Sequence, residues 1–520
     1  MEKQQIIYPL GEQNFEELIK SGAVYVDKTA FIRKLLVNKY YFLSRPRRFG
    51  KSLFLSTLRY FFEGRRDLFK GLAIDSWNEW SWEAFPVVRM NLSEGSYSRP
   101  DGLSKRLLEV IKESEEKFGV ESTEDDPRAR FRNLLVSIYK KTGKGVVVLV
   151  DEYEKPLLDS IEEPHHSNFV KQLSEFYSVL KGNEEMIRFL FITGVTRFGH
   201  LNIFSGLNNL IDISLDNEYS SVCGITAEEL KLNFQPGIEN LAHDNGCGYE
   251  EALTGLKLYY DGYHFSKELL DIYNPYSLLS CLRVSDFVSR WFQSGSSSYL
   301  INKLRSSRFE IENLENITAS ENDLLGVDAT MDNIITLLYQ SGYLTIKNYE
   351  RKRRVFILGL PNREVSEALY SAIIPYYLGE KYRESRNKAL NFIELLEKGR
   401  IQEAMEWLKG YFSSIPYDVK LDYESEFQQV IYAFFALTGL LANATLEKQT
   451  SDGRIDLVIE LTHYVYLFEF KLGTDSNKAL RQINAKEYDL QWRTDNRKIV
   501  KIGVAFSPKS RGIADFTISG

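Results

Sequence analysis

Apolar and polar residues alternate in blocks along the first 215 positions. Short apolar runs, rich in aromatic and β-branched residues, predict buried strands at 40–46, 85–93, 145–156 and 187–198. Apolar residues at helical spacing predict helices at 51–63, 102–141 and 167–182. Because strands separated by helices are typical of a parallel sheet covered on both faces, we expect a doubly wound α/β domain at 1–215.

The pattern changes after this domain. Between 216 and 376 the β-branched runs become sparse and helical spacing dominates. Within this region, residues 333–365 predict a helix, a two-stranded ribbon and a second helix, which is the order of a winged-helix module. Residues 377–409 are charged and helical, so we expect them to link the middle region to the C-terminal part of the chain.

The last part of the chain, 410–520, predicts a separate α/β domain. The expected elements are, in order, an amphipathic helix, two strands joined by a tight turn, a helix and a strand, at 424–439, 454–461, 464–472, 476–490 and 498–507.

Composition limits the class of protein. The chain has 520 residues, of which 43% are hydrophobic, which suits about three packed domains and excludes general disorder. The formal net charge is −7, from 65 Lys and Arg against 72 Asp and Glu. This charge excludes a polybasic tail protein, so any contact with nucleic acid has to use local basic patches.

Cysteine content and hydropathy indicate the compartment. Cys223, Cys247 and Cys281 are too few and too scattered for a disulfide framework or a four-ligand zinc site. The start, MEKQQIIYPLGEQNF, has no apolar signal-peptide core, and no run of about 18 apolar residues predicts a membrane span. We therefore expect a cytoplasmic protein that has no membrane partner.

A candidate phosphate-binding loop, SRPRRFGKS at 44–52, lies between the first predicted strand and helix. There Gly50 and the helix N-terminus would offer N–H groups to phosphates, while Lys51 and Ser52 would contact the phosphates of ATP and Mg²⁺. Arg45 stands where G-x-x-x-x-G-K-[ST] has its first glycine, so the motif alone is a weak signal. The basic residues of the loop are also assigned to nucleotide binding: Arg45, Arg47 and Arg48.

A second element supports the nucleotide hypothesis. The strand 146–150 ends in Asp151 and Glu152, the Walker B pattern, in which Asp151 would hold Mg²⁺ through water and Glu152 would act as general base. The alternative is a strand that ends in a solvated acidic turn. A third strand ends in Thr193, a candidate sensor beside the γ-phosphate. Arg197, four residues later, is either a phosphate contact or a surface charge.

Several separate motifs in the first 210 residues resemble the bacterial AAA-ATPase-like family. They are the YVDKT segment, the RPRRFGKS loop, the VDEYEKP strand end and the ITGVTRF strand. The resemblance implies a P-loop ATPase with the loop and Walker B residues in the roles given above, and it implies that the missing first glycine is a family feature. Asp27 and Lys28 lie in the YVDKT segment, and the sequence leaves their task open.

A second candidate site is the pattern D-x12-E-x-K formed by Asp456, Glu469 and Lys471 across the predicted C-terminal hairpin. Residues two apart in a strand share a face, so Glu469 and Lys471 are neighbours, and Asp456 can reach them from the paired strand. Two close carboxylates need a cation, and oxygen ligands suit Mg²⁺ or Mn²⁺. Lys471 would orient or help deprotonate a water and stabilise developing charge.

Residues on the flanking helices extend this site. Glu426 on the preceding helix is a further metal-ligand candidate, while Gln482 and Tyr488 on the following helix would line it, with Gln482 toward nucleic acid. The alternatives are a solvated strand face and a structural buried ion pair. The apolar flanks in YVYLFEFKL oppose the first, because buried charges need partners.

The order of these elements resembles the PD-(D/E)XK nuclease superfamily, and most of all the small nuclease-like domain that bacteria attach to the AAA-ATPase-like module. The likeness is carried by GRIDLVIE, YLFEFKL and ALRQINAKEY, over about 410–515. Ile455 stands where the superfamily pattern has proline, which is not a ligand. The resemblance implies an α/β restriction-endonuclease-like fold and metal-dependent phosphodiester hydrolysis, although such folds also include inactive relatives.

A basic cluster lies at the tip of the predicted middle ribbon. The segment YERKRRVF places Arg351, Lys352, Arg353 and Arg354 there. The wing of a winged helix lies on the phosphate backbone, so a basic tip suits nucleic acid, with DNA favoured over RNA. The alternative is an exposed, solubilising turn.

Together the motifs predict an ATP-dependent protein that cleaves nucleic acid with Mg²⁺, or with Mn²⁺ at the second site. The pairing of modules suggests defence against foreign DNA or the handling of mobile elements, by analogy alone. The alternative function is a nucleotide-switched regulatory or scaffold protein whose C-terminal domain binds without cutting. A homo-oligomer is compatible with an AAA-type ATPase, but no sequence feature requires one.

Overall fold

The computed structural model describes residues 6–197, 203–204, 207, 209–290, 304, 314, 316–326, 334–378, 382–414, 431, 434–435, 438, 444–450, 453–473, 475–494, 496–507 and 512–520. The chain divides into two compact units. The first comprises Met1–Ser296 and Asn316–Glu364, and the second comprises Ser297–Glu315 and Val365–Gly520.

A five-stranded parallel sheet forms the centre of the first unit. Its strands are β1 (Tyr40–Ser44), β2 (Val87–Asn91), β3 (Val146–Asp151), β4 (Ile187–Gly194) and β5 (Ile211–Asp212). They lie in the order β2-β3-β4-β1-β5. All six residues of β3 are buried, as expected for a strand covered on both faces. The predicted α/β fold with a parallel sheet is confirmed.

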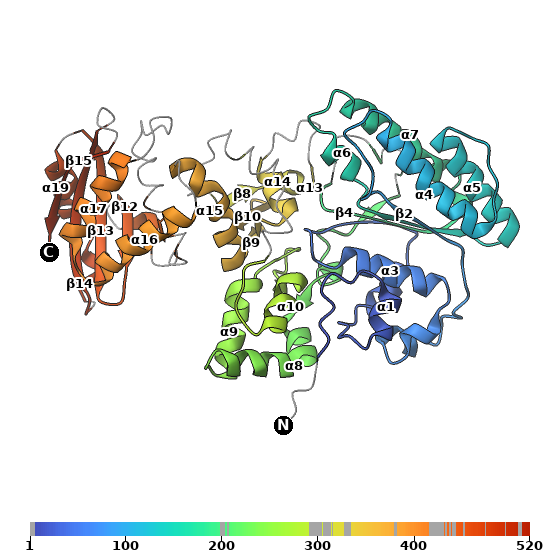
Figure 1. The fold of residues 1–520 in the computed structure, drawn as a ribbon, viewed down its shortest axis with the longest axis horizontal. Helices are drawn as coiled ribbons and strands as arrows, with labels where there is room; N and C mark the ends of the chain where they lie inside the picture. The colour runs from blue at the N-terminus through green and yellow to red at the C-terminus, as the bar shows by residue number, and fades with distance from the viewer. Residues whose placement is uncertain are drawn as a thin grey trace. The chain divides into compact units, whose positions relative to one another are not determined.

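Helices cover both faces of this sheet because its crossovers run in opposite directions. The chain passes from β1 through α3 (Lys51–Phe62) to the edge strand β2, and returns strand by strand to β4. As a result, α3 lies on one face, while α4, α5 and α7 lie on the other (Figure 1). Their bounds are Gly102–Phe118, Pro127–Thr142 and His166–Gly182. The helical stretch predicted at 102–141 is thus two helices, separated at a glycine and a proline.

A helical subdomain follows the sheet in the first unit. It contains α8, α9 and α10, at Ala227–Asp244, Tyr249–Tyr260 and Pro275–Val284, with the short ribbon of β6 (Ile225–Thr226) and β7 (Ile272–Tyr273). Apolar residues of the N-terminal segment, Tyr8, Leu10, Val24 and Val26, pack against its core. The beginning of the chain therefore connects the sheet domain to this subdomain.

The end of the first unit is a helix and ribbon module, which we define as residues 316–359. It contains β8, α13, α14, β9 and β10, at Ile317–Ala319, Glu321–Leu325, Ile334–Ser341, Thr345–Glu350 and Val355–Gly359. The strands form an antiparallel sheet in the order β8-β10-β9. The expected helix and two-stranded ribbon are present, and β8 adds a third strand. The winged-helix assignment itself stays a prediction.

The second unit holds a mixed five-stranded sheet. Its strands follow chain order, β11, β12, β13, β14 and β15, at Ala444–Thr450, Gly453–Glu460, Tyr464–Leu472, Lys498–Ser507 and Gly512–Ser519. Neighbours are antiparallel except β13 and β14, which are parallel and joined through α19 (Ser476–Ala485). The helix expected at 424–439 falls on residues that the structure describes only in part.

Helices cover both faces of this second sheet. On one face, Ile483 of α19 packs with Val465 and Leu467 of β13. On the other, the hydroxyl of Tyr466 donates to the carbonyl of Leu396 in α16 (Tyr382–Glu397) at 2.6 Å. Helix α17 (Ile401–Ser414) also packs against the sheet. Because side chains alternate along β13, its residues at odd positions face α19.

Candidate functional sites

The loop after β1 is closed by the lysine of its GKS sequence. Gly50 has φ +92°, a left-handed conformation that favours glycine, and it is the N-cap of α3. The Nζ of Lys51 donates to the carbonyls of Arg45 at 2.9 Å and Pro46 at 3.0 Å. Burial lowers the pKa of Lys51, and the nearby Glu154 and Asp151 oppose that shift. The lysine therefore holds the loop in shape through these two carbonyls.

Arg45 is buried and serves the fold of the loop. Its guanidinium donates to the carbonyls of Ser214 at 2.7 Å and Tyr219 at 3.1 Å, and it stacks 4.3 Å from the ring centroid of Phe265. Arg45 does not line the cavity described below. Arg45 thus supports the structure of the loop, and its assignment to nucleotide binding is corrected.

The carboxyl ends of three neighbouring strands bring the other predicted ATPase residues together. Strand β4 lies between β1 and β3, with Thr193 opposite Leu43. The hydroxyl of Thr193 donates to Oδ1 of Asp151 at 2.7 Å. Glu152 follows with φ +51° and lines the same cavity as Lys51. The predicted Walker B acid and sensor threonine are therefore in direct contact.

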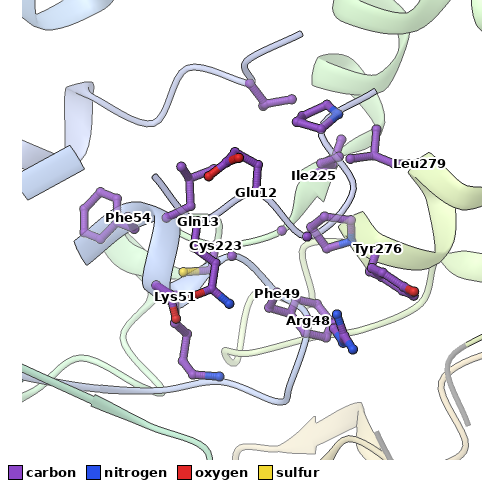
Figure 2. Close-up of a pocket in the computed structure, with 18 of the residues that line it drawn as sticks. Glu12, Gln13, Arg48, Phe49, Lys51, Phe54, Cys223, Ile225, Tyr276 and Leu279 are labelled. Carbon is purple, nitrogen blue, oxygen red and sulfur yellow. The ribbon is translucent and has the colours of Figure 1, made fainter. Parts of the chain in front are cut away.

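A cavity of about 460 Å³ lies over the start of α3 (Figure 2). Its polar wall includes Arg48, Gly50, Lys51, Ser52 and Glu152 of the predicted set. Its apolar wall comes from the N-terminal segment and the helical subdomain: Pro9, Leu10, Val24, Val26, Ile225, Phe234 and Leu279. An apolar pocket of this size with a few convergent polar groups is what a small-molecule ligand such as a nucleotide needs.

Sequence reasoning missed several residues of this cavity, among them Lys155 and Tyr276. Lys155 lines it beside Glu152, and its Nζ pairs with Asp159 at 2.7 Å. Tyr276 of α10 also lines it, and the Arg48 guanidinium lies 4.3 Å from its ring centroid. The position of Lys155, directly after the Walker B acids, was the available signal, whereas nothing local in the sequence points to Tyr276.

The structure supplies the missing task of the YVDKT segment. Oδ1 of Asp27 accepts the N–H of Thr29 at 2.8 Å, and Oδ2 accepts the N–H of Ala73 at 2.7 Å. Lys28 is buried in the cavity wall and donates to both carboxylate oxygens of Glu229, at 2.6 and 2.7 Å. Asp27 thus fixes the segment to the sheet domain, and Lys28 fixes it to α8.

Two further groups lie near the sensor strand. Arg197 does not line the cavity, and its guanidinium pairs with Asp212 of β5 at 2.8 Å. Glu154 is buried, and its Oε1 accepts the N–H of Val195 at 2.6 Å. Burial raises the pKa of Glu154 to about 7. Arg197 therefore lies away from the cavity. Glu154 is a buried carboxyl whose raised pKa allows it to bind a proton near neutral pH.

The second candidate site lies on the α19 face of the C-terminal sheet. Leu457 pairs with Phe468, so the same register sets Asp456 opposite Glu469. Oδ2 of Asp456 accepts the N–H of Phe470 at 2.7 Å. The carboxylate of Glu469, fully buried, accepts from Lys471 at 3.0 Å and from the amide of Gln482 on α19. The D, E, K and Q side chains predicted for one site are thus brought together.

Other predicted members of this carboxylate site have different outcomes. Glu426 lies outside the described residues. Tyr488 is buried in the apolar core with Ile455, Val458 and Trp492, and its place beside the site stays a prediction. In the part of the chain that the structure describes, no group of three or more His, Cys, Asp or Glu side chains is placed to hold a metal ion. The described ligand set is therefore the pair Asp456 and Glu469.

The basic ribbon tip is an ordered turn between β9 and β10. Its side chains are all exposed: Arg351, Lys352, Arg353 and Arg354. The N–H of Arg354 donates to the carbonyl of Glu350 at 2.8 Å, and Arg354 has φ +55°. Arg353 lies 3.6 Å from the carboxylate of Glu350. The four exposed cations thus lie together at the turn of a hydrogen-bonded hairpin.

Comparisons with known proteins match both ends of the chain to family models. A family model described as "Predicted AAA-ATPase" matches residues 9–204, and one described as "PD-(D/E)XK nuclease superfamily" matches 422–516. An uncharacterized protein in the vnfD 5′ region of Azotobacter chroococcum mcd 1 is 34% identical over 523 residues, covering 98% of each chain. The chain belongs to this AAA-ATPase-like family with a C-terminal PD-(D/E)XK nuclease superfamily domain. The family resemblance inferred from the motifs is therefore confirmed.

The matched ranges of this AAA-ATPase-like protein include both candidate sites. A solved structure, the Aeropyrum pernix ORC2 protein in ADPNP–ADP complexes, aligns with 67% of this chain and 93% of its own, at 12% identity and a TM-score of 0.26. A TM-score this low does not establish a shared fold. Within the described residues, none of the helices combines the length and hydrophobicity that crossing a membrane requires.

Proposed function

We propose that this protein binds and hydrolyses ATP in the cavity over α3 and cleaves nucleic acid at the Asp456–Glu469 cluster. The observation that carries the first half is the convergence of Lys51, Glu152 and the Thr193–Asp151 hydrogen bond at the ends of adjacent strands. The convergence of Asp456, Glu469, Lys471 and Gln482 supports the second half.

In the ATPase site each residue has one task. Lys51 exchanges the two loop carbonyls for phosphate oxygens, and the N–H groups at the start of α3 bind the same phosphates. Glu152 accepts a proton from the attacking water, and Thr193 orients Asp151. Ser52 and Asp151 offer the hydroxyl and carboxylate oxygens that suit Mg²⁺, which when bound stabilises charge on the phosphates.

In the nuclease site the carboxylates and the lysine share the work. Asp456 and Glu469 offer oxygen ligands to Mg²⁺ or Mn²⁺, which when bound polarises the scissile phosphate. Lys471, whose side chain is about one-third exposed at 35%, orients the attacking water and stabilises charge on the phosphate. Gln482 holds Glu469 in place from α19. Removal of the Asp456 carboxylate is expected to abolish cleavage.

The basic ribbon tip is the surface to which nucleic-acid binding is assigned, with DNA favoured over RNA. Four exposed cations on one turn match the negative charge of a phosphate backbone, whatever the net charge of the whole chain. A role in defence against foreign DNA or in handling mobile elements is proposed only from the pairing of an ATPase with a nuclease-like domain.

The substitution Lys51→Ala tests the ATPase assignment. We expect ATP hydrolysis to fall roughly 100-fold or more, because the site loses its preorganised charge toward the phosphates. Phosphate release is measured at saturating ATP for the parent, for Lys51→Ala and for Lys171→Ala, which removes a 75% exposed lysine on α7 as control. Hydrolysis by Lys51→Ala at the rate of the parent and the control would show that the phosphate loop is wrongly assigned.

A further inference from the structure

The helix and ribbon module, residues 316–359, packs directly against the predicted ATP site. Both belong to the first unit. Two sets of contacts join them, one at the phosphate loop and one at the exit of the sensor strand. The chain of contacts ends at the basic ribbon tip. That the tip binds nucleic acid is part of the proposed function, and this inference rests on it.

At the phosphate loop, the contact is between Pro46 and Gly342, the residue that follows α14. Gly342 has φ +88°, and a Cβ added there would lie 2.7 Å from the Cβ of Pro46, so only glycine fits. The buried hydroxyl of Tyr263 donates to the Gly342 carbonyl at 3.1 Å, while the Tyr263 ring packs edge-on against Phe49 with centroids 4.8 Å apart. The loop and the base of the ribbon thus share one packed interface.

At the sensor strand, the contact runs through the side chain of Gln340. Its Oε1 accepts the N–H of Arg197 at 3.0 Å, and its Nε2 donates to the carbonyl of Leu324 in α13 at 2.9 Å. Gln340 is 4% exposed, so both hydrogen bonds are shielded from water. Four residues upstream of Arg197, Thr193 holds the Walker B acid Asp151. The module is therefore hydrogen-bonded to the segment that touches the reacting groups.

The ATP site contains an element with two alternative sets of partners. In this structure Lys51 donates to the carbonyls of Arg45 and Pro46. Phosphates compete for the same ammonium group, so nucleotide binding releases the Pro46 carbonyl, and the Pro46 ring is the group that packs on Gly342. A change in nucleotide state therefore acts at the base of the ribbon.

The ribbon is suited to transmit such a change. Strand β9 starts three residues after Gly342 and runs through six residues, or about 20 Å, to the tip. It pairs with β10, which also pairs with β8, so the three strands form one hydrogen-bonded sheet. A shift at its base is a shift of Arg351, Lys352, Arg353 and Arg354.

We propose that nucleotide and nucleic acid bind with linked affinities. We further propose that Gln340 is a positioning residue for this linkage, because its side chain bonds Arg197 and Leu324 and its helix α14 ends next to Gly342. Linkage is reciprocal, so each ligand changes the affinity of the other by the same factor, and factors of roughly 5- to 150-fold are typical. The inference concerns regulation of the proposed ATP site.

The test is a binding experiment on the full chain carrying Asp456→Ala, so that the nucleic acid stays intact. The affinity for a DNA duplex of about three helical turns is measured by fluorescence anisotropy, with and without a non-hydrolysable ATP analogue and Mg²⁺. The affinity for the analogue is then measured with and without duplex. Gln340→Met, which removes both hydrogen bonds, is compared with Gln235→Met, the same change at an exposed site on α8.

We expect a linkage factor of at least about fivefold in the parent and the Gln235→Met control, falling toward one in Gln340→Met while each ligand alone still binds. Tyr263→Phe, which removes only the hydroxyl bonded to Gly342, should lower the factor too and replaces Gln340→Met if that variant does not fold. A factor of one in the parent overturns the inference and leaves the proposed function standing. Absence of duplex binding overturns both the inference and the proposed function. A linkage factor equal to that of the parent in both Gln340→Met and Tyr263→Phe shows that the linkage does not depend on these contacts.

Discussion

Individual residues at the cavity over α3 are held in unusual conformations. Arg48 and Glu152 have φ +71° and +51°, in the left-handed region that costs a non-glycine residue about 1 kcal/mol or more. Both line the cavity, and Arg48 also stacks on Tyr276. Such strain persists only where the surroundings enforce it, so it supports a functional cavity at this place.

Glu154 gives a residue-scale prediction about pH. Burial raises its pKa to about 7 in the folded protein, above its ordinary value of 4.5. The folded state therefore binds more protons than the unfolded state between these values, so stability is full below about pH 4.5 and is lost as pH rises through 7. We expect Glu154→Gln to remove this loss, which amounts to about 3 kcal/mol at most, because glutamine stays neutral.

The measurement for Glu154 compares thermal unfolding midpoints at pH 5 and pH 8. The midpoint of the parent should fall relative to that of Glu154→Gln as pH rises. Glu113→Gln, the same substitution at an exposed position on α4, should follow the parent. If the parent and Glu154→Gln change in parallel between the two pH values, the buried carboxyl does not titrate in this window.

At the scale of elements, continuous apolar runs made β1, β2, β3 and β4 predictable, because a strand buried on both faces is apolar throughout. The missed strands lack that local signal. Strand β11, ATLEKQT, is mostly polar and lies at a sheet edge, and β5 is only two residues long. Both strands form because they pair with a neighbouring strand. The hydrophobic periodicity of a single segment does not reveal such pairing.

The basic ribbon tip gives an element-scale prediction about salt. Replacing its four cations with alanine should weaken duplex binding and lower the slope of log affinity against log salt by about one for each phosphate that the tip no longer neutralises. Anisotropy titrations at several salt concentrations measure this slope. The matched control replaces four exposed lysines on other elements: Lys105, Lys112, Lys140 and Lys171. Equal slopes for the tip variant and the control would show that the tip is a solubilising turn and does not contact nucleic acid.

At the scale of the whole molecule, the motifs predicted the residues of the two candidate sites but not their surroundings. Lys51, Asp151 and Thr193 were identifiable because each ends or follows an apolar strand. The apolar wall of the cavity was not, since Pro9, Phe234 and Leu279 come from distant segments that only the fold brings together. Arg45, a basic residue in the loop sequence, is in the structure a buried support of that loop.

The central claim is that one chain couples ATP hydrolysis to metal-dependent cleavage. The most direct measurement is cleavage of labelled DNA and RNA with Mg²⁺ or Mn²⁺, with and without ATP, for the parent, Lys51→Ala and Asp456→Ala. We predict cleavage by the parent that ATP changes, metal-dependent cleavage by Lys51→Ala that ATP leaves unchanged, and none by Asp456→Ala. No cleavage by the parent under any condition, or cleavage by Asp456→Ala at the parental rate, would contradict this claim.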